Sequence, residues 1–277
     1  MDHLDDLVTR VLAPNPGLMT LEGTNTYLVG APGSGEVVVV DPGPDADEHR
    51  VAVEAAAAAR DSRIAAVVVT HHHRDHAQAA GWASRWGVGL HAFSPEMVRR
   101  VAAGADPQAL RDGDTLALAG VRLQAVHTPG HSSDHLCLRV VETDVLLTGD
   151  HVLGRGTSVV VYPDGDMSDY VASLERLAAS PANALYPGHG PALDQPSKTL
   201  AEYLAHRGER ERQVLAALHA GDQDPMAIVR RVYADVDAAL HPAASRSVHA
   251  HLEKLVREGA AVRDGAPDDE GTAYRVR

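Results

Sequence analysis

Short apolar runs separated by helical stretches organise the first 190 residues of the chain. Short runs of three to six residues rich in Val, Leu and Thr, bounded by Gly, Pro or Asp, are typical of β-strands. They predict strands over residues 26–29, 37–41, 65–70, 121–126, 136–141, 145–148 and 184–186. The run 65–70 is an apolar strand candidate without alternation, as expected of a strand that is covered on both faces.

Helical segments alternate with these strands. The alanine-rich residues 51–60, residues 78–86 and the amphipathic segment 169–179 predict helices. Strands that alternate with helices favour an α/β fold in which sheets are sandwiched between outer helices.

From Ser197 onward the pattern becomes almost continuously helical. Residues 198–220 run to Gly221, and Pro225 lies near the start of a second helix through Tyr233. Residues 245–258 repeat apolar side chains at helical spacing and stop at Gly259. The sequence therefore predicts three helices in this part of the chain.

A terminal hairpin completes the second part. Strand candidates 260–263 and 273–276 flank an acidic turn that contains Asp264, Asp268, Asp269 and Glu270. Three helices and a hairpin describe a winged helix-turn-helix. The expected organisation is an α/β domain over residues 1–195, the start of a connecting helix over 196–205, and a winged-helix domain over 206–277.

Composition fits a folded protein with a real core, since 44% of the 277 residues are hydrophobic and 23% are charged. The net charge of -13 is concentrated in residues 1–205, which carry -12, whereas residues 206–277 carry -1. Such acidity argues against a broad electrostatic grip on nucleic acid, and bound cations would offset part of it. A lone cysteine, no long apolar run and no signal-peptide pattern lead us to expect a cytoplasmic protein without membrane contact.

The 17 histidines are the compositional anomaly, and a cluster of them follows a predicted strand. His71, His73, Asp75 and His76 lie directly after the apolar run 65–70, on a loop that a sheet would hold rigidly. His71 and His73 can direct two imidazoles at one ion, while Asp75 and His76 can face a second. His72 alternates away from its neighbours and is expected to pack or to support a ligand.

Three later segments carry the same ligand types at strand ends. His131, Asp150 and His189 each follow a strand candidate and lie in a turn with Gly or Pro. The combined set holds nitrogen and oxygen ligands that suit zinc, with Mn²⁺ or Fe²⁺ as other occupants. A chance occurrence of histidines in loops is the competing interpretation, and the repeated order of strand end and ligand argues against it.

The pattern His71-x-His73-x-Asp75-His76, followed by His131, Asp150 and His189, resembles the metallo-β-lactamase superfamily over about residues 15–195. The resemblance implies an αββα sandwich with metals at one edge of the paired sheets. It also implies two Zn²⁺ per chain, the first held by His71, His73 and His131. The second would be held by Asp75, His76 and His189, with Asp150 bridging both. The B1 β-lactamases have cysteine in place of Asp150, so antibiotic hydrolysis is not favoured.

A narrower resemblance is to the β-lactamase-like protein 2 group. It rests on residues 22–29 (EGTNTYLV), 129–135 (PGHSSDH), 149–154 (GDHVLG) and 198–207, which end in His206-Arg207. That group also has a C-terminal winged helix. It includes a metal-dependent endoribonuclease acting on single-stranded RNA and fungal thioesterases of polyketide release, so the resemblance implies a hydrolase and leaves its substrate open.

The mechanism expected from these residues needs no side-chain nucleophile. Two cations that share one water would lower its pKa toward neutrality, with Asp150 balancing their charge and Asp75 aiming the attacking oxygen. Asp75 and Asp150 are therefore the predicted catalytic residues. Asp41 is expected to orient a ligand histidine. His135 and His151, beside the ligand loops, are interpreted at least equally well as hydrogen-bonded structural residues.

The sequence leaves more than one interpretation of the substrate-binding residues and of the function. Lys198, His206 and Arg207 are predicted to hold an anionic substrate, with a solvated helix face as the equal alternative. The first functional hypothesis is phosphodiester hydrolysis of single-stranded RNA, and the second is hydrolysis of an acyl-glutathione or acyl-carrier thioester. A third is a winged-helix DNA-binding protein with a sensory metal domain, which the acidic hairpin disfavours. Assembly as a homodimer is left open.

Overall fold

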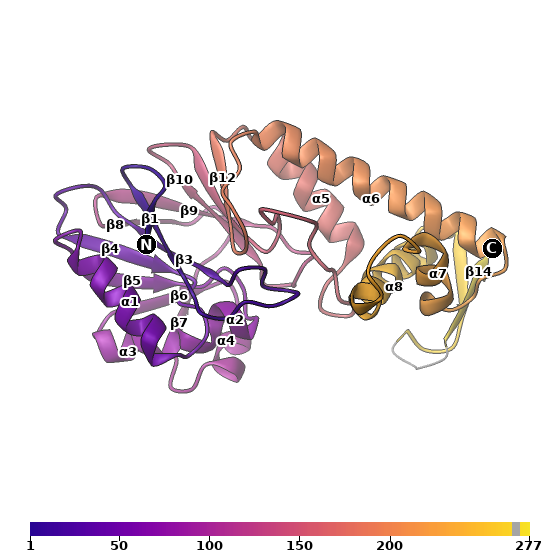
Figure 1. The fold of residues 1–277 in the computed structure, drawn as a ribbon, viewed down its shortest axis with the longest axis horizontal. Coiled ribbons are helices and arrows are strands. Elements are labelled where there is room, and N and C mark those ends of the chain that lie inside the picture. Colours follow the sequence, from indigo (N-terminus) through magenta and orange to yellow (C-terminus); the bar gives the residue numbers. More distant parts are fainter. Residues whose placement is uncertain (268–271) are drawn as a thin grey trace. The chain divides into compact units, whose positions relative to one another are not determined.

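A computed structural model describes residues 1–267 and 272–277, and its chain divides into two units (Figure 1). The first unit comprises Met1–Thr128, Asp134–Gly156 and Pro181–Ser197, and the second comprises Pro129–Ser133, Thr157–Ser180 and Lys198–Arg277. The sequence placed a boundary at residues 195–205, and α6 (Pro196–His219) runs through that region as one helix.

The first unit contains a sheet of seven strands in sequential order. Its strands are β1 (Asp2–His3), β2 (Val8–Leu12), β3 (Asn25–Val29), β4 (Glu36–Val40), β5 (Arg63–Val68), β6 (Gly89–Ala92) and β7 (Pro107–Ala109). The strands from β1 to β4 are antiparallel, whereas β4, β5, β6 and β7 are parallel neighbours. The carboxyl ends of these parallel strands therefore meet at one edge of the sheet.

A second sheet of five strands has the order β12-β11-β10-β9-β8. Its strands are β8 (Thr115–Leu118), β9 (Val121–His127), β10 (Leu136–Val140), β11 (Val145–Gly149) and β12 (Ala184–Pro187). The pairing is antiparallel except between β11 and β12, which are parallel.

Alternate side chains of β4 enter two different cores, which explains its uninterrupted valine run. Val38 and Val40 pack with Leu123 and Leu138 of the second sheet. Val37 and Val39 instead join the cluster that contains alanines of a neighbouring helix. A strand buried on both faces needs no polar alternation.

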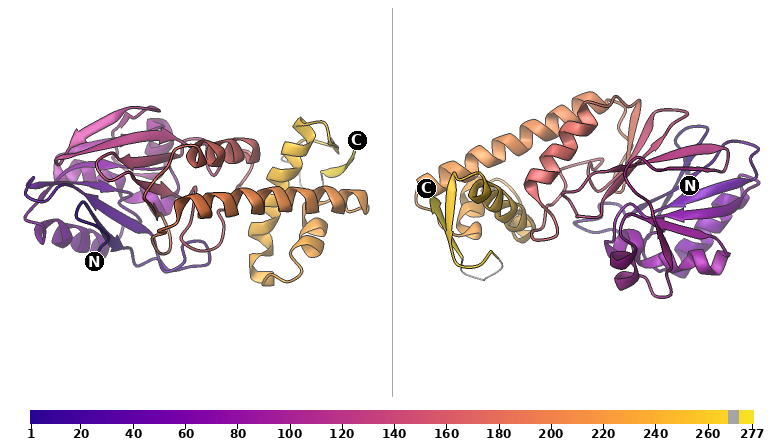
Figure 2. Two further views of the ribbon diagram at one scale, coloured as in Figure 1. Left: turned by 90° about the horizontal axis from the view of Figure 1, so that it is seen from above. Right: turned by 180° about the vertical axis from the view of Figure 1, so that it is seen from behind.

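Helices cover the outer face of the first sheet (Figures 1 and 2). They are α1 (Asp47–Ala58), α2 (Arg74–Ala77), the 3₁₀ turn η1 (Gln78–Gly81), α3 (Trp82–Trp86) and α4 (Pro95–Val101). The helix predicted at 78–86 is thus a 3₁₀ turn followed by one short helix. Trp82 and Trp86 meet edge to face at 5.7 Å between ring centroids, as expected of packing residues.

The second unit is mainly helical (Figure 2). It contains α5 (Met167–Ala178), most of α6, α7 (Pro225–Val232), the short turn η2 (Ala238–Leu240), α8 (His241–Arg257), and the hairpin strands β13 (Ala261–Asp264) and β14 (Ala273–Val276). Val214, Ile228, Leu252 and Tyr274 join α6, α7, α8 and β14 in one apolar cluster. This arrangement confirms the winged helix; Asp268, Asp269 and Glu270 of its turn lie outside the described residues.

Several elements escaped the sequence pattern because they are short. β6, β7 and β8 have four residues or fewer, and β2 carries two adjacent polar residues, Thr9 and Arg10, so their periodicity is weak. Among the described residues, no helix is long and apolar enough to cross a membrane.

Candidate metal centre

The carboxyl ends of β4 and β5 position the first part of the centre. Asp41 follows β4 and is 2% exposed; its Oδ1 accepts the Thr70 amide at 2.7 Å and its Oδ2 accepts the Thr70 hydroxyl at 2.8 Å. The Oδ2 of Asp41 also lies 2.9 Å from Nδ1 of His76. Asp41 therefore orients a histidine, as predicted. No sequence pattern singles out Thr70, because its contact with Asp41 arises only in the fold.

The loop after β5 carries the histidine motif. His71 is buried, and its Nδ1 lies 3.0 Å from the Thr70 hydroxyl. His73 is the residue before α2, so Asp75 and His76 fall in the first turn of that helix. The short helix turns His76 inward, where it is fully buried, while 29% of the Asp75 side chain stays exposed.

Asp150 and His189 reach the same place from the other sheet. Asp150 follows β11, and His189 lies two residues beyond β12. The Oδ1 of Asp150 lies 3.3 Å from Nε2 of His76 and 3.4 Å from Nε2 of His189. The Oδ2 of Asp75 lies 3.1 Å from the same nitrogen of His189. β11 and β12 are parallel neighbours, which is why residues far apart in the sequence converge here.

The chemistry of these donors fits a divalent cation. Nδ1 of His76 faces a carboxylate and Nδ1 of His189 faces the Gly23 carbonyl at 3.1 Å, so each ring directs Nε2 toward the shared space. The two Nε2 atoms lie 3.2 Å apart with the carboxylates of Asp75 and Asp150 around them. Nitrogen lone pairs and carboxylate oxygens this close repel one another unless a positive charge lies between them. Bound protons or a metal cation can supply that charge.

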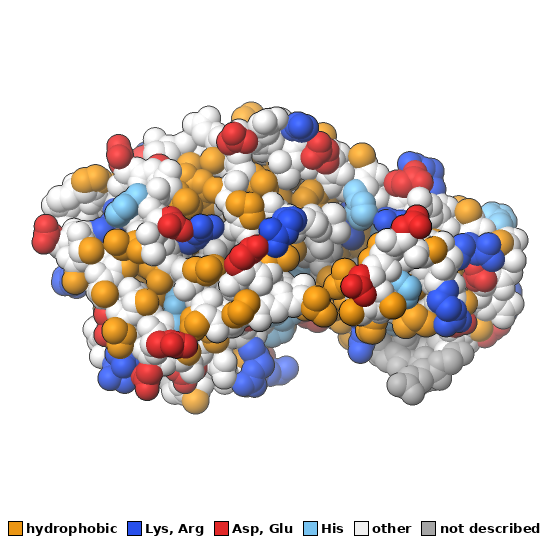
Figure 3. All heavy atoms as spheres, in the orientation of Figure 1, with side chains coloured by type: hydrophobic (Ala, Val, Ile, Leu, Met, Phe, Trp, Pro, Cys, Tyr) orange, Lys and Arg blue, Asp and Glu red, His pale blue; other side chains and the backbone are white. Residues whose placement is uncertain are grey.

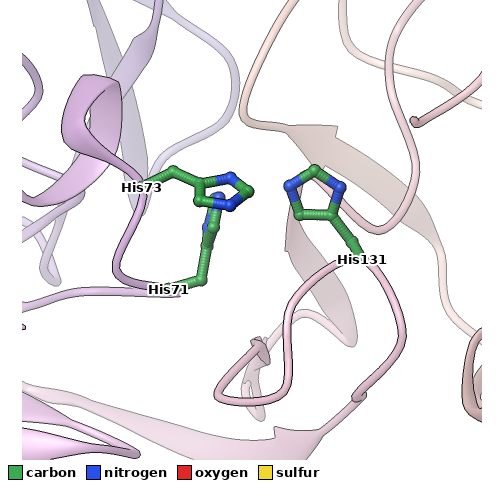
Figure 4. Close-up of side chains that lie close together, drawn as sticks. All are labelled: His71, His73 and His131. Carbon is green, nitrogen blue, oxygen red and sulfur yellow. The ribbon is translucent and has the colours of Figure 1, made fainter. Parts of the chain in front are cut away.

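A second group of nitrogen donors consists of His71, His73 and His131, whose ligand atoms lie within 4.8 Å of one another. Figure 4 shows the rings of His71 and His73 on one loop facing the ring of His131. Nδ1 of His131 lies 2.8 Å from the Val159 carbonyl, which fixes the orientation of that ring. The described residues thus bring together all seven predicted ligands in overlapping groups.

Opposite charges shift the protonation of the centre. Burial opposes a charge on His189, but Asp150 and Asp75 outweigh it and raise the pKa of His189 to about 9. Burial likewise opposes a charge on His76, yet Asp150, Asp75 and Asp41 hold its pKa well above the usual range. Burial would raise the pKa of Asp150, but His189 and His76 keep it well below the usual range. Without a cation, protons therefore balance the carboxylates.

The metal-free protein is accordingly expected to lose stability as the pH rises from about 6.5 to 9. The folded pKa of His189 exceeds the ordinary histidine value of 6.5, so its contribution is complete below pH 6.5 and disappears as the pH passes about 9. His189 alone can contribute at most about 3 kcal/mol. The unfolding temperature of chelator-treated protein should fall by several degrees across this pH range. In His189→Gln it should depend less on pH. An unfolding temperature that stays constant up to pH 9.5 would contradict the assignment.

The three residues predicted to hold substrate have different surroundings. Lys198 is exposed and lies 3.9 Å from Glu202 on the same helix. Burial lowers the pKa of His206 to about 4, so its ring is neutral at pH 7 and adds no positive charge there. Arg207 is 2% exposed; it donates to the Ser158 carbonyl and lies 4.8 Å above the Tyr170 ring. These contacts give Arg207 a structural role, and its contact with substrate stays a prediction.

The other residues considered in the sequence are buried or hydrogen-bonded near the site. Nδ1 of His72 lies 2.9 Å from Oδ1 of the buried Asp134, which agrees with the expectation that His72 supports the ligand loop. Cys137 is fully buried, as expected of a small apolar residue. His135 and His151 are both fully buried. His151 follows Asp150 in the sequence, and Nε2 of His135 lies 3.1 Å from the Asp150 amide nitrogen.

Known families match both parts of the chain. The model of the metallo-beta-lactamase superfamily matches residues 19–189, and that of the beta-lactamase associated winged helix domain matches residues 225–270. A beta-lactamase-like protein 2 homolog from Caenorhabditis elegans is 34% identical over 94% of this chain and 87% of its own length. The thioesterase pkgB of Emericella nidulans is 40% identical over 79% of this chain and 62% of its own length.

Solved structures share the fold. A metallo-beta-lactamase family protein from Thermus thermophilus is 25% identical, with a TM-score of 0.82 over 99% of this chain and all of that one. A beta-lactamase domain protein from Burkholderia ambifaria is 22% identical, with a TM-score of 0.85 over 100% of this chain and 93% of that one. The two family models and the relatives in sequence show that the chain is a hydrolase of the metallo-beta-lactamase superfamily, with a C-terminal beta-lactamase-associated winged helix.

Proposed function

We propose that this chain is a dinuclear metal hydrolase, with Zn²⁺ as the expected cation, that cleaves acyl thioesters. The observation that carries the proposal is the convergence of His71, His73, Asp75, His76, His131, Asp150 and His189 in overlapping groups of nitrogen and oxygen donors. Divalent cations held there would polarise the scissile bond and make water a nucleophile near neutral pH.

The protein's own residues orient and balance this chemistry. Asp41 and the Gly23 carbonyl hold the rings of His76 and His189 with Nε2 directed inward. The carboxylate of Asp150, between those rings, balances positive charge. Asp75 is the partly exposed member, and although burial opposes ionisation, His76 and His189 lower its pKa. Its ionised carboxylate can therefore accept a hydrogen bond from the attacking water and orient it.

Two observations favour a thioester over RNA. Relatives that share 40% and 34% identity with this chain are named thioesterases, the second of them an atrochrysone carboxyl ACP thioesterase of Aspergillus fumigatus. The chain carries a net charge of -13, which repels a polyanion. On the face drawn in Figure 3, basic groups stand among acidic ones and form no continuous patch of described residues.

The winged helix adds little positive charge for a nucleic acid. Lys254 pairs with Glu211 and Glu258, and Arg257 pairs with Asp166. Cleavage of single-stranded RNA remains the second candidate, favoured by the beta-lactamase-like protein 2 homologs that match along nearly the whole chain.

A substrate panel on protein of measured metal content tests the proposal. It would contain S-lactoylglutathione, an acyl-pantetheine thioester and a labelled single-stranded RNA, each with wild-type, chelator-treated and His73→Ala protein. We expect thioester hydrolysis that falls at least about 100-fold in both controls, because each removes an electrostatic stabiliser of the transition state. RNA cleavage with the same two losses, and no thioester turnover, would select the second candidate. Thioester turnover that survives chelation would overturn the metal mechanism.

A further inference from the structure

His135 is a fully buried histidine that the proposed chemistry does not use. It is the residue directly before β10, and β10 lies next to β11, the strand that leads to Asp150. Its ring centroid lies 5.1 Å from that of His71. A histidine at this position could serve in packing alone, or it could orient a neighbouring metal-ligating residue.

The hydrogen bonds of His135 fix the position of its ring proton. Nε2 lies 3.1 Å from the backbone nitrogen of Asp150, and because a backbone amide can only donate, Nε2 must carry a lone pair. The proton is therefore on Nδ1, which lies 2.9 Å from the Thr128 hydroxyl and donates to it. The ring is thus a neutral Nδ1–H tautomer.

Thr128 and Cys137 continue this chain of hydrogen bonds. The hydroxyl of Thr128 donates to Sγ of Cys137 at 3.4 Å, and that sulfur lies 3.7 Å from the Thr148 carbonyl. All these side chains are fully buried. His135 is therefore held by Thr128, the residue that follows β9, independently of the Asp150 loop.

The backbone before Asp150 passes close against His135. Gly149 has a φ of 46°, and a Cβ built there would lie 2.7 Å from Nε2 of His135 and 2.8 Å from the Thr70 hydroxyl. The turn therefore lies between His135 and the residue that supports His71. Asp150 leaves this turn with its Oδ1 within 3.4 Å of Nε2 of both His76 and His189.

We propose that His135 is a positioning residue: its Nε2 holds the Asp150 amide and thereby aims the Asp150 carboxylate into the metal centre. The inference rests on the proposed function in that Asp150 is taken as a metal-holding group. A lost amide contact would let the turn shift, and buried partners that orient a metal-holding residue typically change metal affinity by about 10- to 100-fold.

Two substitutions separate this role from simple packing. In His135→Gln, the side-chain carbonyl oxygen reaches the place of Nε2 and can still accept the Asp150 amide. In His135→Asn, the shorter amide reaches only the place of Nδ1, so it can bond Thr128 but leaves the Asp150 amide without its acceptor. Both substituted side chains are smaller and more polar than histidine, so a packing role predicts a loss of folding stability in both variants. The positioning role predicts that metal affinity falls only in His135→Asn.

The measurement is Zn²⁺ affinity by competition with a chromophoric chelator, on full-length protein. We expect His135→Gln within about 3-fold of wild type and His135→Asn weaker by about 10- to 100-fold. Equal affinities of the two variants, or a weaker His135→Gln, would overturn the proposal.

Hydrogen exchange of the wild-type Asp150 amide, in metal-free protein, needs no variant and decides the case if both substitutions prevent folding. The amide should exchange at least about 100-fold more slowly than an unprotected one. Exchange at the unprotected rate would overturn the proposal. Wild-type protein that binds no Zn²⁺ would instead refute the proposed function, while the exchange result would still report on His135.

Discussion

Replacing Asp150 with alanine is expected to lower hydrolysis by about 10³-fold or more and to remove bound metal at the same time. The Oδ1 of Asp150 lies between His76 and His189, 3.3 Å and 3.4 Å from their Nε2 atoms. Alanine would leave the histidines without the negative charge that balances a cation, so affinity and rate should fall together. Metal content by atomic emission and turnover of the substrate selected by the panel would be measured on the same samples.

The fold should survive this substitution. The two cores on either side of β4 are built from apolar residues that do not include Asp150. Circular dichroism should be unchanged, and Asp194→Ala, which removes an exposed carboxylate elsewhere in the same unit, serves as the matched control. A fully active, metal-loaded Asp150→Ala protein would refute the ligand assignment.

Gly188→Ala is expected to weaken metal binding and turnover by at least about 100-fold, since it displaces groups that hold the centre. A Cβ at position 188 would lie 2.6 Å from Cε1 of His76 and 2.7 Å from Oδ1 of Asp150. The backbone cannot retreat, because its amide donates to the Gly149 carbonyl and its carbonyl accepts the Asn25 amide, both at 2.7 Å. Overpacking of this kind also costs about 1–3 kcal/mol of stability.

The matched control is Gly208→Ala within α6. The only neighbour of its added Cβ would be a terminal nitrogen of Arg212 at 3.6 Å, which is ordinary contact. Alanine there should stabilise the protein by about 0.5–1 kcal/mol, because glycine in a helix interior costs that much. Zinc affinity, turnover and chemical unfolding would be compared for the two variants. Wild-type metal affinity in Gly188→Ala would show that the strand end does not approach the centre as closely as described.

The loops that carry the predicted ligands could be located in the sequence because each is a local pattern. His71, His73 and His76 follow an apolar run, and Asp150 and His189 lie in Gly-containing turns after strand candidates. Such signals need only neighbouring residues. The winged helix was predictable for the same reason, since helical spacing and the terminal strand pair occur within one stretch of about 70 residues.

The residues predicted to hold substrate show what a local pattern leaves undecided. His206 and Arg207 were predicted to hold an anionic substrate or to lie on a solvated helix face. In the fold, burial makes His206 neutral at pH 7, and Arg207 stacks on Tyr170. A helix in the sequence does not reveal which of its sides another element will cover. Whether a charged or titratable side chain on this helix is buried can therefore be seen only in the tertiary structure.

By itself, the sequence determined the longer strands and helices, the donor types of the predicted centre and the winged helix, because periodicity and turn chemistry are properties of adjacent residues. Only the tertiary structure decided which residues support those donors. Thr70 meets Asp41 through parallel pairing of β4 and β5, and His135 meets the Asp150 amide through the register of β10 and β11. Sheet register and packing bring such residues within hydrogen-bond distance, and neither is encoded in any single short segment.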